Sequence, residues 1–192
     1  MTSQKKAASR QSQEKVKIEG LNKPVVLIGL MGAGKSTIGR RLAKRMGWKF
    51  ADSDSEIVDA AGCSISDIFA IHGEQIFRDL EERVITRLLS QDKMVMATGG
   101  GAWMQAKVRE QIQESAISVW LHAELDVLLA RVTKRNNRPL LETGDKRAIL
   151  QKLMEERYPV YGQADITVES GDGPHENVVE RVLDALKGHV AA

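Results

Sequence analysis

The stretch that most constrains the fold is GLMGAGKST, which begins at Gly29, the last residue of the apolar run PVVLIG. It matches the pattern G-x-x-x-x-G-K-[ST] through Gly29, Gly34, Lys35 and Ser36. Glycines allow a tight turn whose N–H groups point at phosphates, and the following helix adds its positive end. Lys35 can reach the β- and γ-phosphates, and Ser36 can coordinate Mg²⁺. The pattern predicts a nucleotide site formed by Gly32, Ala33, Gly34, Lys35, Ser36 and Thr37.

Apolar runs with strand character alternate along the chain with segments of helical periodicity. Such alternation predicts right-handed crossovers and a mostly parallel sheet with helices on both faces, an α/β fold. The expected strands cover residues 24–29, 48–52, 93–98, 116–121 and 165–169, and the expected helices cover 36–46, 74–89, 125–134 and 175–187.

The length of 192 residues suits one domain, and the charge is unevenly distributed along it. Residues 1–23 hold six Lys or Arg against two Glu and few apolar residues, which predicts a disordered basic tail. Nucleic-acid binding or organelle targeting by this tail stays open beside a plain solvated extension. Residues 24–192 then form a single domain, interrupted by the aperiodic segment KRNNRPLLETGD at 134–145, which predicts a flap.

The composition excludes several classes of protein. No apolar run reaches the roughly 18 residues that a membrane span needs, and no apolar segment near the N-terminus resembles a secretory signal, so we expect a cytoplasmic protein. Cys63 is the only cysteine, which excludes a disulfide within the chain and a multi-cysteine zinc site. The four histidines show no spacing typical of metal ligands.

Asp52 and Asp54 in WKFADSDSEI follow a predicted strand. Alternate residues of a strand point to the same side, and ligands of open α/β sheets bind at the carboxyl ends of the strands. Asp52 could therefore hold Mg²⁺ through water, and Asp54 could accept the proton of an attacking hydroxyl. The sequence DSDSE is equally typical of a solvated helix N-terminus, so the spacing alone leaves both interpretations open.

Two other classes of nucleotide-binding protein fit poorly. A regulatory GTPase needs N-K-x-D, whereas the only Asn-Lys pair precedes the glycine-rich loop and lacks the aspartate. The D-x-x-G match at Asp59 follows no apolar strand. Motor and transporter ATPases usually have an aspartate at the end of an apolar strand, whereas the third strand here ends in Thr98 and three glycines.

The triplet Gly99-Gly100-Gly101 after the third strand would allow close approach of a polyhydroxylated ligand to bare backbone N–H groups. Arg78 in IFRDLEE lies at the edge of a helix face that includes Phe77. Taken alone, an arginine in this position is more often part of a surface ion pair than of a binding site.

Six motifs occur together in an order and spacing that resemble the shikimate kinases. These are GLMGAGKSTIGRRLA, DSDSEI, FRDLEE, ATGGG, NRPLL and ERYPVYGQAD, between about Pro24 and the last helix. The resemblance implies a P-loop three-layer α/β/α fold with a five-stranded parallel sheet, similar to nucleoside monophosphate kinases. It also implies transfer of the ATP γ-phosphate to the 3-hydroxyl of shikimate, in aromatic amino acid biosynthesis.

The resemblance also assigns roles to residues. Asp54 matches the residue that contacts the acceptor hydroxyl. Asp52 and Ser36 match the residues near the metal ion. Arg78 and Arg157 match a pair that binds the shikimate carboxylate, for which a planar guanidinium is suited. The remaining matches are Gly99, Gly100 and Gly101 on the acceptor ring, Arg138 as a lid arginine that reaches the phosphates with Lys35, and Arg131 and Pro174 around the adenine.

The resemblance implies Mg²⁺ as cofactor and ATP and shikimate as the small-molecule partners, without nucleic acid or membrane, in a protein expected to be a monomer. Two alternatives remain for comparison. One is a kinase for another polyol acid such as gluconate, against which the three glycines and the two arginines argue. The other is an inactive nucleotide-binding module, against which the intact Lys35, Ser36, Asp54 and Arg138 argue.

Overall fold

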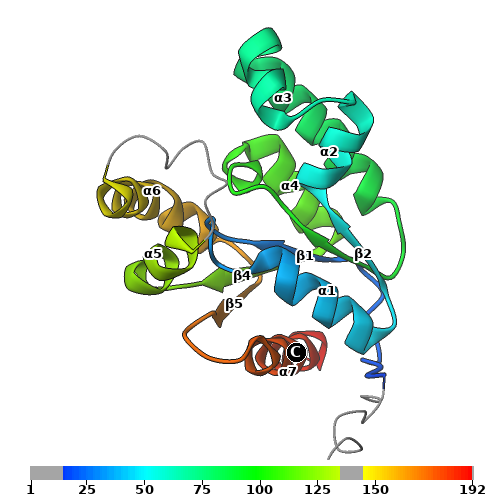
Figure 1. Ribbon diagram of the computed structural model, residues 1–192. Coiled ribbons are helices and arrows are strands. Elements are labelled where there is room, and N and C mark those ends of the chain that lie inside the picture. Colours follow the sequence, from blue (N-terminus) through cyan, green and yellow to red (C-terminus); the bar gives the residue numbers. More distant parts are fainter. Residues whose placement is uncertain (1–14, 135–144, 192) are drawn as a thin grey trace, which may run out of the picture.

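A five-stranded sheet forms the centre of the computed structural model, which describes residues 15–134 and 145–191 (Figure 1). The strand order is β2-β3-β1-β4-β5, and every neighbouring pair is parallel. The predicted α/β fold with a five-stranded parallel sheet is therefore confirmed. The strands are β1 (Val25–Ile28), β2 (Lys49–Asp52), β3 (Met94–Ala97), β4 (Ile117–His122) and β5 (Ile166–Glu169).

Strand β1 lies in the middle of the sheet, and all four of its residues are fully buried. Its Val26 is paired with Met96 of β3 on one side and with Ser118 of β4 on the other. The strand order changes direction at β1, and ligands of such sheets bind at this switch point, outside the carboxyl ends of the strands. The glycine-rich loop leaves the sheet there.

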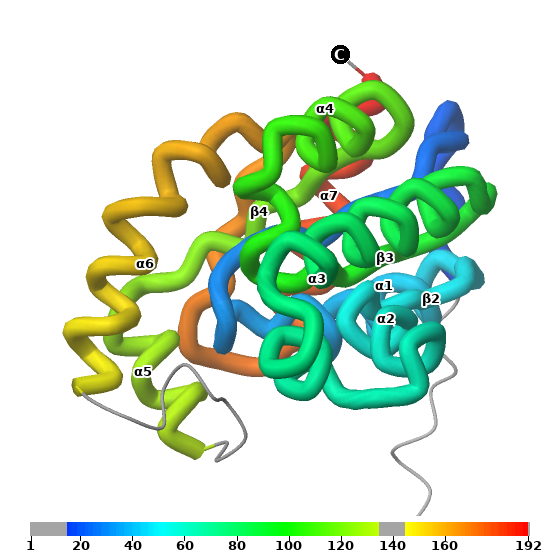
Figure 2. Tube along the Cα trace, turned by 90° about the horizontal axis from the view of Figure 1, so that it is seen from above, coloured from blue at the N-terminus to red at the C-terminus, as the bar shows by residue number. Residues whose placement is uncertain are grey.

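Helices cover both faces of the sheet, as Figure 1 shows. α1 and α7 lie together on one face, while α4, α6 and the second part of α3 lie on the other. Figure 2 shows α5 and α6 at one side of the molecule and α2 and α3 at the other. Their bounds are α1 (Lys35–Met46), α2 (Ser53–Ala61), α3 (Ile65–Leu89), α4 (Ala106–Ser115), α5 (Leu125–Thr133), α6 (Lys146–Tyr161) and α7 (His175–Ala191), with a short 3₁₀ helix η1 (Ala102–Met104).

Helix α3 is longer than the predicted helix over 74–89. It begins at Ile65, where Ser64 and Asp67 form a capping box, and it is interrupted at Gly73, whose φ of 80° is not helical. The predicted helix is the part after this break. Helices α2 and α4 were not predicted, because each has only two buried residues and thus a weak apolar periodicity.

Residues 15–23, part of the predicted tail, contact the domain. The Val16 backbone N–H donates to the Arg45 carbonyl at 2.7 Å, and Leu21 is only 5% exposed. The disorder expected over 1–23 is thus not seen at 15–23, because these few apolar side chains find a partner surface beside α1. Residues 1–14 lie outside the described residues.

Candidate active site

The glycine-rich loop joins β1 to α1 and depends on positive φ angles. These are 141° at Gly29, 85° at Gly32 and 94° at Gly34. A side chain at Gly29 would also place Cβ 2.8 Å from the Leu121 carbonyl oxygen. Lys35 Nζ donates to the carbonyl of Gly29 at 2.7 Å and to that of the next residue at 3.0 Å. The loop therefore curves around the Lys35 ammonium group and opens at the positive end of α1.

Asp52 caps helix α2 and also contacts the glycine-rich loop. Its Oδ1 accepts from the Asp54 N–H at 3.2 Å, which caps α2, and its Oδ2 accepts from the Ser36 hydroxyl at 2.6 Å. The second contact joins the carboxylate to the glycine-rich loop. Ser36 and Asp52 thus offer two oxygen donors side by side, the ligand type that Mg²⁺ prefers.

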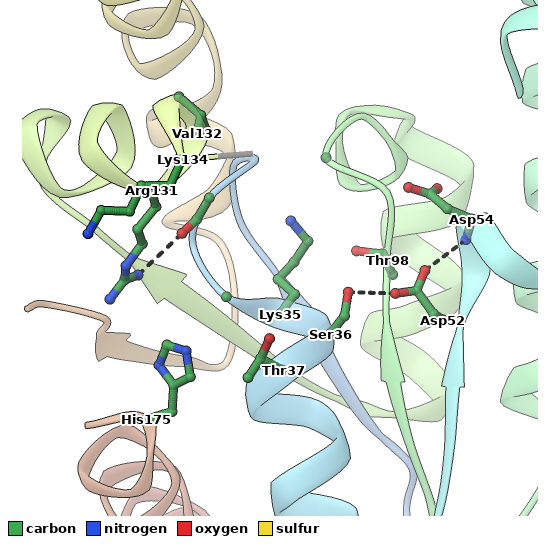
Figure 3. Close-up of a pocket in the computed structure, with 13 residues that line it drawn as sticks. Lys35, Ser36, Thr37, Asp52, Asp54, Thr98, Arg131, Val132, Lys134 and His175 are labelled. Carbon is green, nitrogen blue, oxygen red and sulfur yellow. Dashed lines mark hydrogen bonds between the residues drawn. The ribbon is translucent and has the colours of Figure 1, made fainter. Parts of the chain in front are cut away.

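Asp54 lies in the first turn of α2, so of the two interpretations that the spacing left open, the helix N-terminus describes the backbone and the extended strand does not. The chain turns into the helix directly after Asp52, because that residue ends β2 and caps α2. Asp54 nevertheless lines the same cavity as Asp52 (Figure 3). A helical turn, and not an extended strand, thus brings the second carboxylate to the cavity.

The nucleotide cavity, as we call the hollow at the glycine-rich loop, has a volume of about 220 Å³ and lies at the carboxyl edge of the sheet. Figure 3 shows Asp52, Asp54 and Thr98 on one side of Lys35, and Arg131 and His175 on the other. Its lining residues are Gly32, Gly34, Lys35, Ser36, Thr37, Asp52, Asp54, Thr98, Gly100, Arg131, Val132, Lys134 and His175.

Arg131 of α5 holds the far end of this cavity through backbone and hydroxyl oxygens. Its guanidinium donates to the Gly32 carbonyl at 3.2 Å, to Ser170 Oγ at 3.1 Å and to the Gly171 carbonyl at 2.6 Å. Burial lowers the pKa of Arg131, and the charge of Asp172 opposes that shift. Arg131 therefore connects the glycine-rich loop to the segment between β5 and α7.

Two predicted nucleotide residues do not line the cavity. Ala33 is only 1% exposed, and its carbonyl accepts from Ser170 Oγ at 2.7 Å. Pro174 precedes α7 and is absent from the lining, whereas the next residue, His175, is part of it. Sequence reasoning missed His175, because a single histidine after a turn carries no ligand pattern.

A second cavity of about 790 Å³, which we call the acceptor cavity, adjoins the first. Asp54 and Gly100 line both cavities, so the two meet at these residues. The acceptor cavity has an apolar side and a side with charged groups. Its lining residues are Met31, Asp54, Ile65, Ser66, Phe69, Ala70, Phe77, Arg78, Glu81, Gly99, Gly100, Gly101 and Arg157.

Arg78 is held in the acceptor cavity by a buried carboxylate. Its Nη1 donates to Glu81 Oε2 at 2.7 Å, and its Nη2 donates to Glu74 at 3.1 Å. Glu81 is 1% exposed and also accepts from Gln105 Nε2 at 2.7 Å. Burial raises the pKa of Glu81, although the Arg78 guanidinium opposes the shift. This network orients the guanidinium toward the glycine triplet.

At two positions of the glycine triplet, a side chain would collide with the end of a neighbouring charged side chain. A Cβ at Gly99 would lie 2.6 Å from Asp54 Oδ1, and a Cβ at Gly101 would lie 2.8 Å from Arg78 Nη1. At Gly100 the carbonyl accepts from Arg157 Nη1 at 3.1 Å. The predicted acceptor residues therefore gather around one cavity, which the structure assembles from α2, α3, α6 and the loop after β3.

Of the predicted flap at 134–145, the structure describes only Lys134 and Asp145. Arg138 lies outside the described residues.

Among the described residues, no group of three or more His, Cys, Asp or Glu side chains could form a metal cage. Mg²⁺ does not need such a cage, because it usually keeps several waters and takes one or two protein oxygens beside the phosphates.

Of the helices in 15–134 and 145–191, none has the length and apolar character required to cross a membrane.

Sequence reasoning missed three groups beside the predicted residues. Glu81 lies three positions after Arg78 and Tyr161 lies four positions after Arg157, so helical spacing could have indicated both. No local signal indicated Gln105, because its contact with Glu81 joins separate elements.

Comparison with known proteins gives consistent relatives. The sequence model of the family described as "Shikimate kinase" matches residues 31–187. The shikimate kinase of Rhodopseudomonas palustris is 52% identical over 187 residues, which cover 97% of this chain and 92% of that protein. The shikimate kinase of Brucella canis is 48% identical over 169 residues, covering 88% and 84% respectively. The solved structure of shikimate kinase from Acinetobacter baumannii in complex with shikimate has a TM-score of 0.83 and 36% identity, covering 88% of this chain and 95% of that one.

Proposed function

Because this chain belongs to the shikimate kinase family, we propose that it transfers the γ-phosphate of ATP to the 3-hydroxyl of shikimate. The product is shikimate 3-phosphate, an intermediate of aromatic amino acid biosynthesis. The observation that carries the proposal is the junction of the two cavities at Asp54 and Gly100. Phosphoryl transfer needs the acceptor hydroxyl in line with the γ-phosphate, and adjoining cavities supply that arrangement.

The nucleotide is proposed to bind along the cavity from Asp52 to His175. The N–H groups from Gly32 to Thr37 would surround the phosphates, and Lys35 would reach the β- and γ-phosphates. Arg131 would lie beside the adenine, since it lines the cavity on the far side of Lys35 from Asp52 (Figure 3). Ala33 would contact the phosphates through its backbone, and Pro174 would lie next to the adenine. Both roles are taken from the family resemblance.

The acceptor is proposed to bind in the acceptor cavity. Arg78 and Arg157 would bind its carboxylate, because both guanidinium groups line the cavity and each can form paired hydrogen bonds to a carboxylate. Gly99, Gly100 and Gly101 would contact the ring through their backbone, and a Cβ at Gly99 or Gly101 would crowd Asp54 or Arg78. A polar ring with one carboxylate fits this combination of two cations and bare backbone.

Asp54 is proposed to act on the acceptor 3-hydroxyl. Its carboxylate would orient that hydroxyl and accept its proton as the oxygen forms its bond to the γ-phosphorus and the bond to the β-phosphate oxygen breaks. Lys35 would stabilise the charge that moves onto the leaving ADP. Arg138 would add a further cation from the proposed lid, a role taken from the resemblance alone.

Mg²⁺ is the proposed cofactor, held by Ser36 directly and by Asp52 through water. When bound, it would neutralise charge on the β- and γ-phosphates. The 2.6 Å contact between Ser36 Oγ and Asp52 Oδ2 supports this role, since it brings two hard oxygen donors to the phosphate end of the cavity.

We further propose a single kinase domain over 24–192 that works as a monomer in the cytoplasm. ATP and shikimate are both small, so neither nucleic acid nor membrane binding is part of the proposal.

The test is ADP formation from Mg-ATP with shikimate, with gluconate and without acceptor, at matched concentrations. We expect acceptor-dependent ADP only with shikimate, because gluconate lacks the ring that the glycine triplet would contact. Turnover with gluconate instead would contradict the assignment of the acceptor cavity. ATP binding without turnover on either acceptor would favour the inactive binding module.

A further inference from the structure

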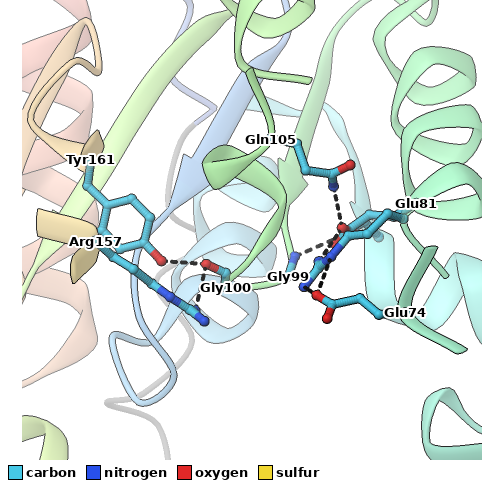
Figure 4. A network of polar contacts seen from close by, with 9 residues as sticks. Glu74, Glu81, Gly99, Gly100, Gln105, Arg157 and Tyr161 are labelled. Atoms are coloured by element: carbon cyan, nitrogen blue, oxygen red, sulfur yellow. Dashed lines mark hydrogen bonds and ion pairs between the residues drawn. The ribbon is translucent and has the colours of Figure 1, made fainter. Parts of the chain in front are cut away.

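Tyr161, the last residue of α6, is fully buried, yet its hydroxyl faces a polar atom of the acceptor cavity. It donates to the Gly100 carbonyl oxygen. Arg157 lies one helical turn earlier and donates to the same oxygen at 3.1 Å (Figure 4). Two donors from α6 therefore share a single acceptor in the loop after β3.

This shared oxygen belongs to the residue at which both cavities meet. A carbonyl oxygen has two lone pairs, so both hydrogen bonds can form at once. Arg157, however, is also a proposed ligand of the acceptor carboxylate, and a carboxylate bound through the Nη1–Nη2 edge would take the Nη1 donor that now contacts Gly100. A carbonyl left without any donor in a buried site is unfavourable, so the release of Arg157 depends on a second donor to Gly100.

We infer that Tyr161 is a positioning residue for the acceptor: its hydroxyl holds the Gly100 carbonyl and thereby frees Arg157 to bind the acceptor carboxylate. The inference rests on the proposed function, because it assumes the carboxylate clamp. It concerns a residue that would not touch the substrate and would act through Gly100 and Arg157.

Two further observations support this role. Burial raises the pKa of Tyr161, against the opposing charge of Arg157, so the hydroxyl stays protonated and remains a donor at neutral pH. The indole N–H of Trp103 donates to the Val160 carbonyl at 2.9 Å and connects α6 to the same loop independently. Removal of the Tyr161 hydroxyl should therefore leave the fold in place.

The chain offers a matched control on the same helix. The Tyr158 hydroxyl also donates to a backbone carbonyl, that of Ala123, at 2.5 Å, but Tyr158 lines neither cavity. Tyr161→Phe and Tyr158→Phe each remove one such hydrogen bond, so similar losses of thermal stability are expected. Only Tyr161→Phe should raise the acceptor KM, by about three- to tenfold, with kcat and the KM for ATP close to wild type.

A double variant tests whether the effect passes through Arg157. In an Arg157→Ala background no guanidinium competes for the Gly100 carbonyl, so the addition of Tyr161→Phe should leave the acceptor KM unchanged. Additive effects would overturn the inference. So would an unchanged acceptor KM in Tyr161→Phe alone, or equal changes in kcat and both KM values.

A readout without turnover separates this inference from the proposed function. In Tyr161→Phe, Arg157 would be the one donor left to the Gly100 carbonyl among the described residues. The side-chain N–H groups of Arg157 should therefore exchange with water more slowly, as measured by NMR. Tyr158→Phe should leave this exchange rate unchanged. Unchanged exchange in Tyr161→Phe overturns the inference. Wild-type protein that fails to phosphorylate shikimate would contradict the proposed function, while the exchange measurement would still decide the role of Tyr161.

Discussion

The nucleotide cavity and the acceptor cavity are built in different ways. In the first, the phosphate end is a glycine-rich loop whose backbone carbonyls hold cationic side chains: Lys35 donates to the Gly29 carbonyl, and Arg131 donates to the Gly32 carbonyl and, outside the loop, to that of Gly171. The second is formed by side chains that come from separate elements, as in the contact of Gln105 with Glu81. A phosphate site thus follows from one local loop, whereas a carboxylate site requires the whole tertiary structure.

The two cavities also differ in where their charges lie. The nucleotide cavity has three cationic side chains in its lining, Lys35, Arg131 and Lys134. Its two carboxylates, Asp52 and Asp54, lie together on one side of Lys35 (Figure 3). The acceptor cavity buries the Glu81 carboxylate beneath Arg78, so part of its cationic charge is already balanced. The first is therefore suited to a polyanion, and the second to a single carboxylate.

The largest expected effect concerns Asp54, which both cavities share. Asp54→Asn should lower kcat by about 10²–10⁴-fold and leave both KM values near wild type, because the amide keeps the shape but accepts no proton. Steady-state kinetics would measure this, with the exposed Asp59→Asn on the same helix as control. Near-normal turnover in Asp54→Asn would show that Asp54, at the junction of the cavities, does not accept the proton of the acceptor hydroxyl.

Arg78→Lys should weaken binding in the acceptor cavity and leave the nucleotide cavity unaffected. The lysine keeps a cation beside the buried Glu81 but loses the planar pair of donors, so the acceptor KM should rise about ten- to hundredfold. The KM for ATP should stay unchanged. The control is Arg87→Lys, on the same helix, where the arginine forms an exposed ion pair with Glu56. A change in the KM for ATP alone would remove Arg78 from the acceptor cavity.

Asp52→Asn should change the metal requirement. Asparagine caps a helix about as well as aspartate, so thermal stability should be kept. The Mg²⁺ concentration for half-maximal activity should rise about tenfold, since a water-mediated ligand loses its charge. Chelation of the metal with EDTA should abolish turnover in the wild type and the variant alike. An unchanged Mg²⁺ requirement would leave Asp52 with the capping role only.

The smallest expected effect is the pH dependence of Glu81. Burial raises its pKa above the usual 4.5, so the folded protein retains a proton that the unfolded chain has already released. The contribution of Glu81 to the free energy of unfolding is therefore present below about pH 4.5 and is lost as the pH rises through the raised pKa. Denaturation from pH 4.5 upward should show wild type losing stability relative to Glu81→Gln. The opposite slope would contradict the raised pKa.

The contrast between the cavities also explains what the sequence could predict. The glycine-rich loop was recognised from one stretch, because Gly29 and Gly34 need positive φ and Lys35 follows directly. Strands β1, β3 and β4 were predicted because their buried runs are apolar almost throughout. These features are local and therefore visible in the sequence.

What escaped prediction depends on contacts between distant segments. The break of α3 at Gly73 has no periodic signature, and the turn of the chain into α2 at Asp52 was only one of two interpretations that the sequence left open. The buried position of Glu81 follows from α3 lying against the segment that carries Gln105. The sharing of Gly100 by Arg157 and Tyr161 likewise requires α6 to meet the loop after β3.

The most direct test of the account is a two-substrate kinetic comparison of Arg131→Ala with Arg157→Ala, in which ATP and shikimate are both varied. If the two cavities are separate and meet only at Asp54 and Gly100, Arg131→Ala should raise the KM for ATP alone. Arg157→Ala should raise the KM for shikimate alone. Equal changes of both KM values in both variants would contradict the account.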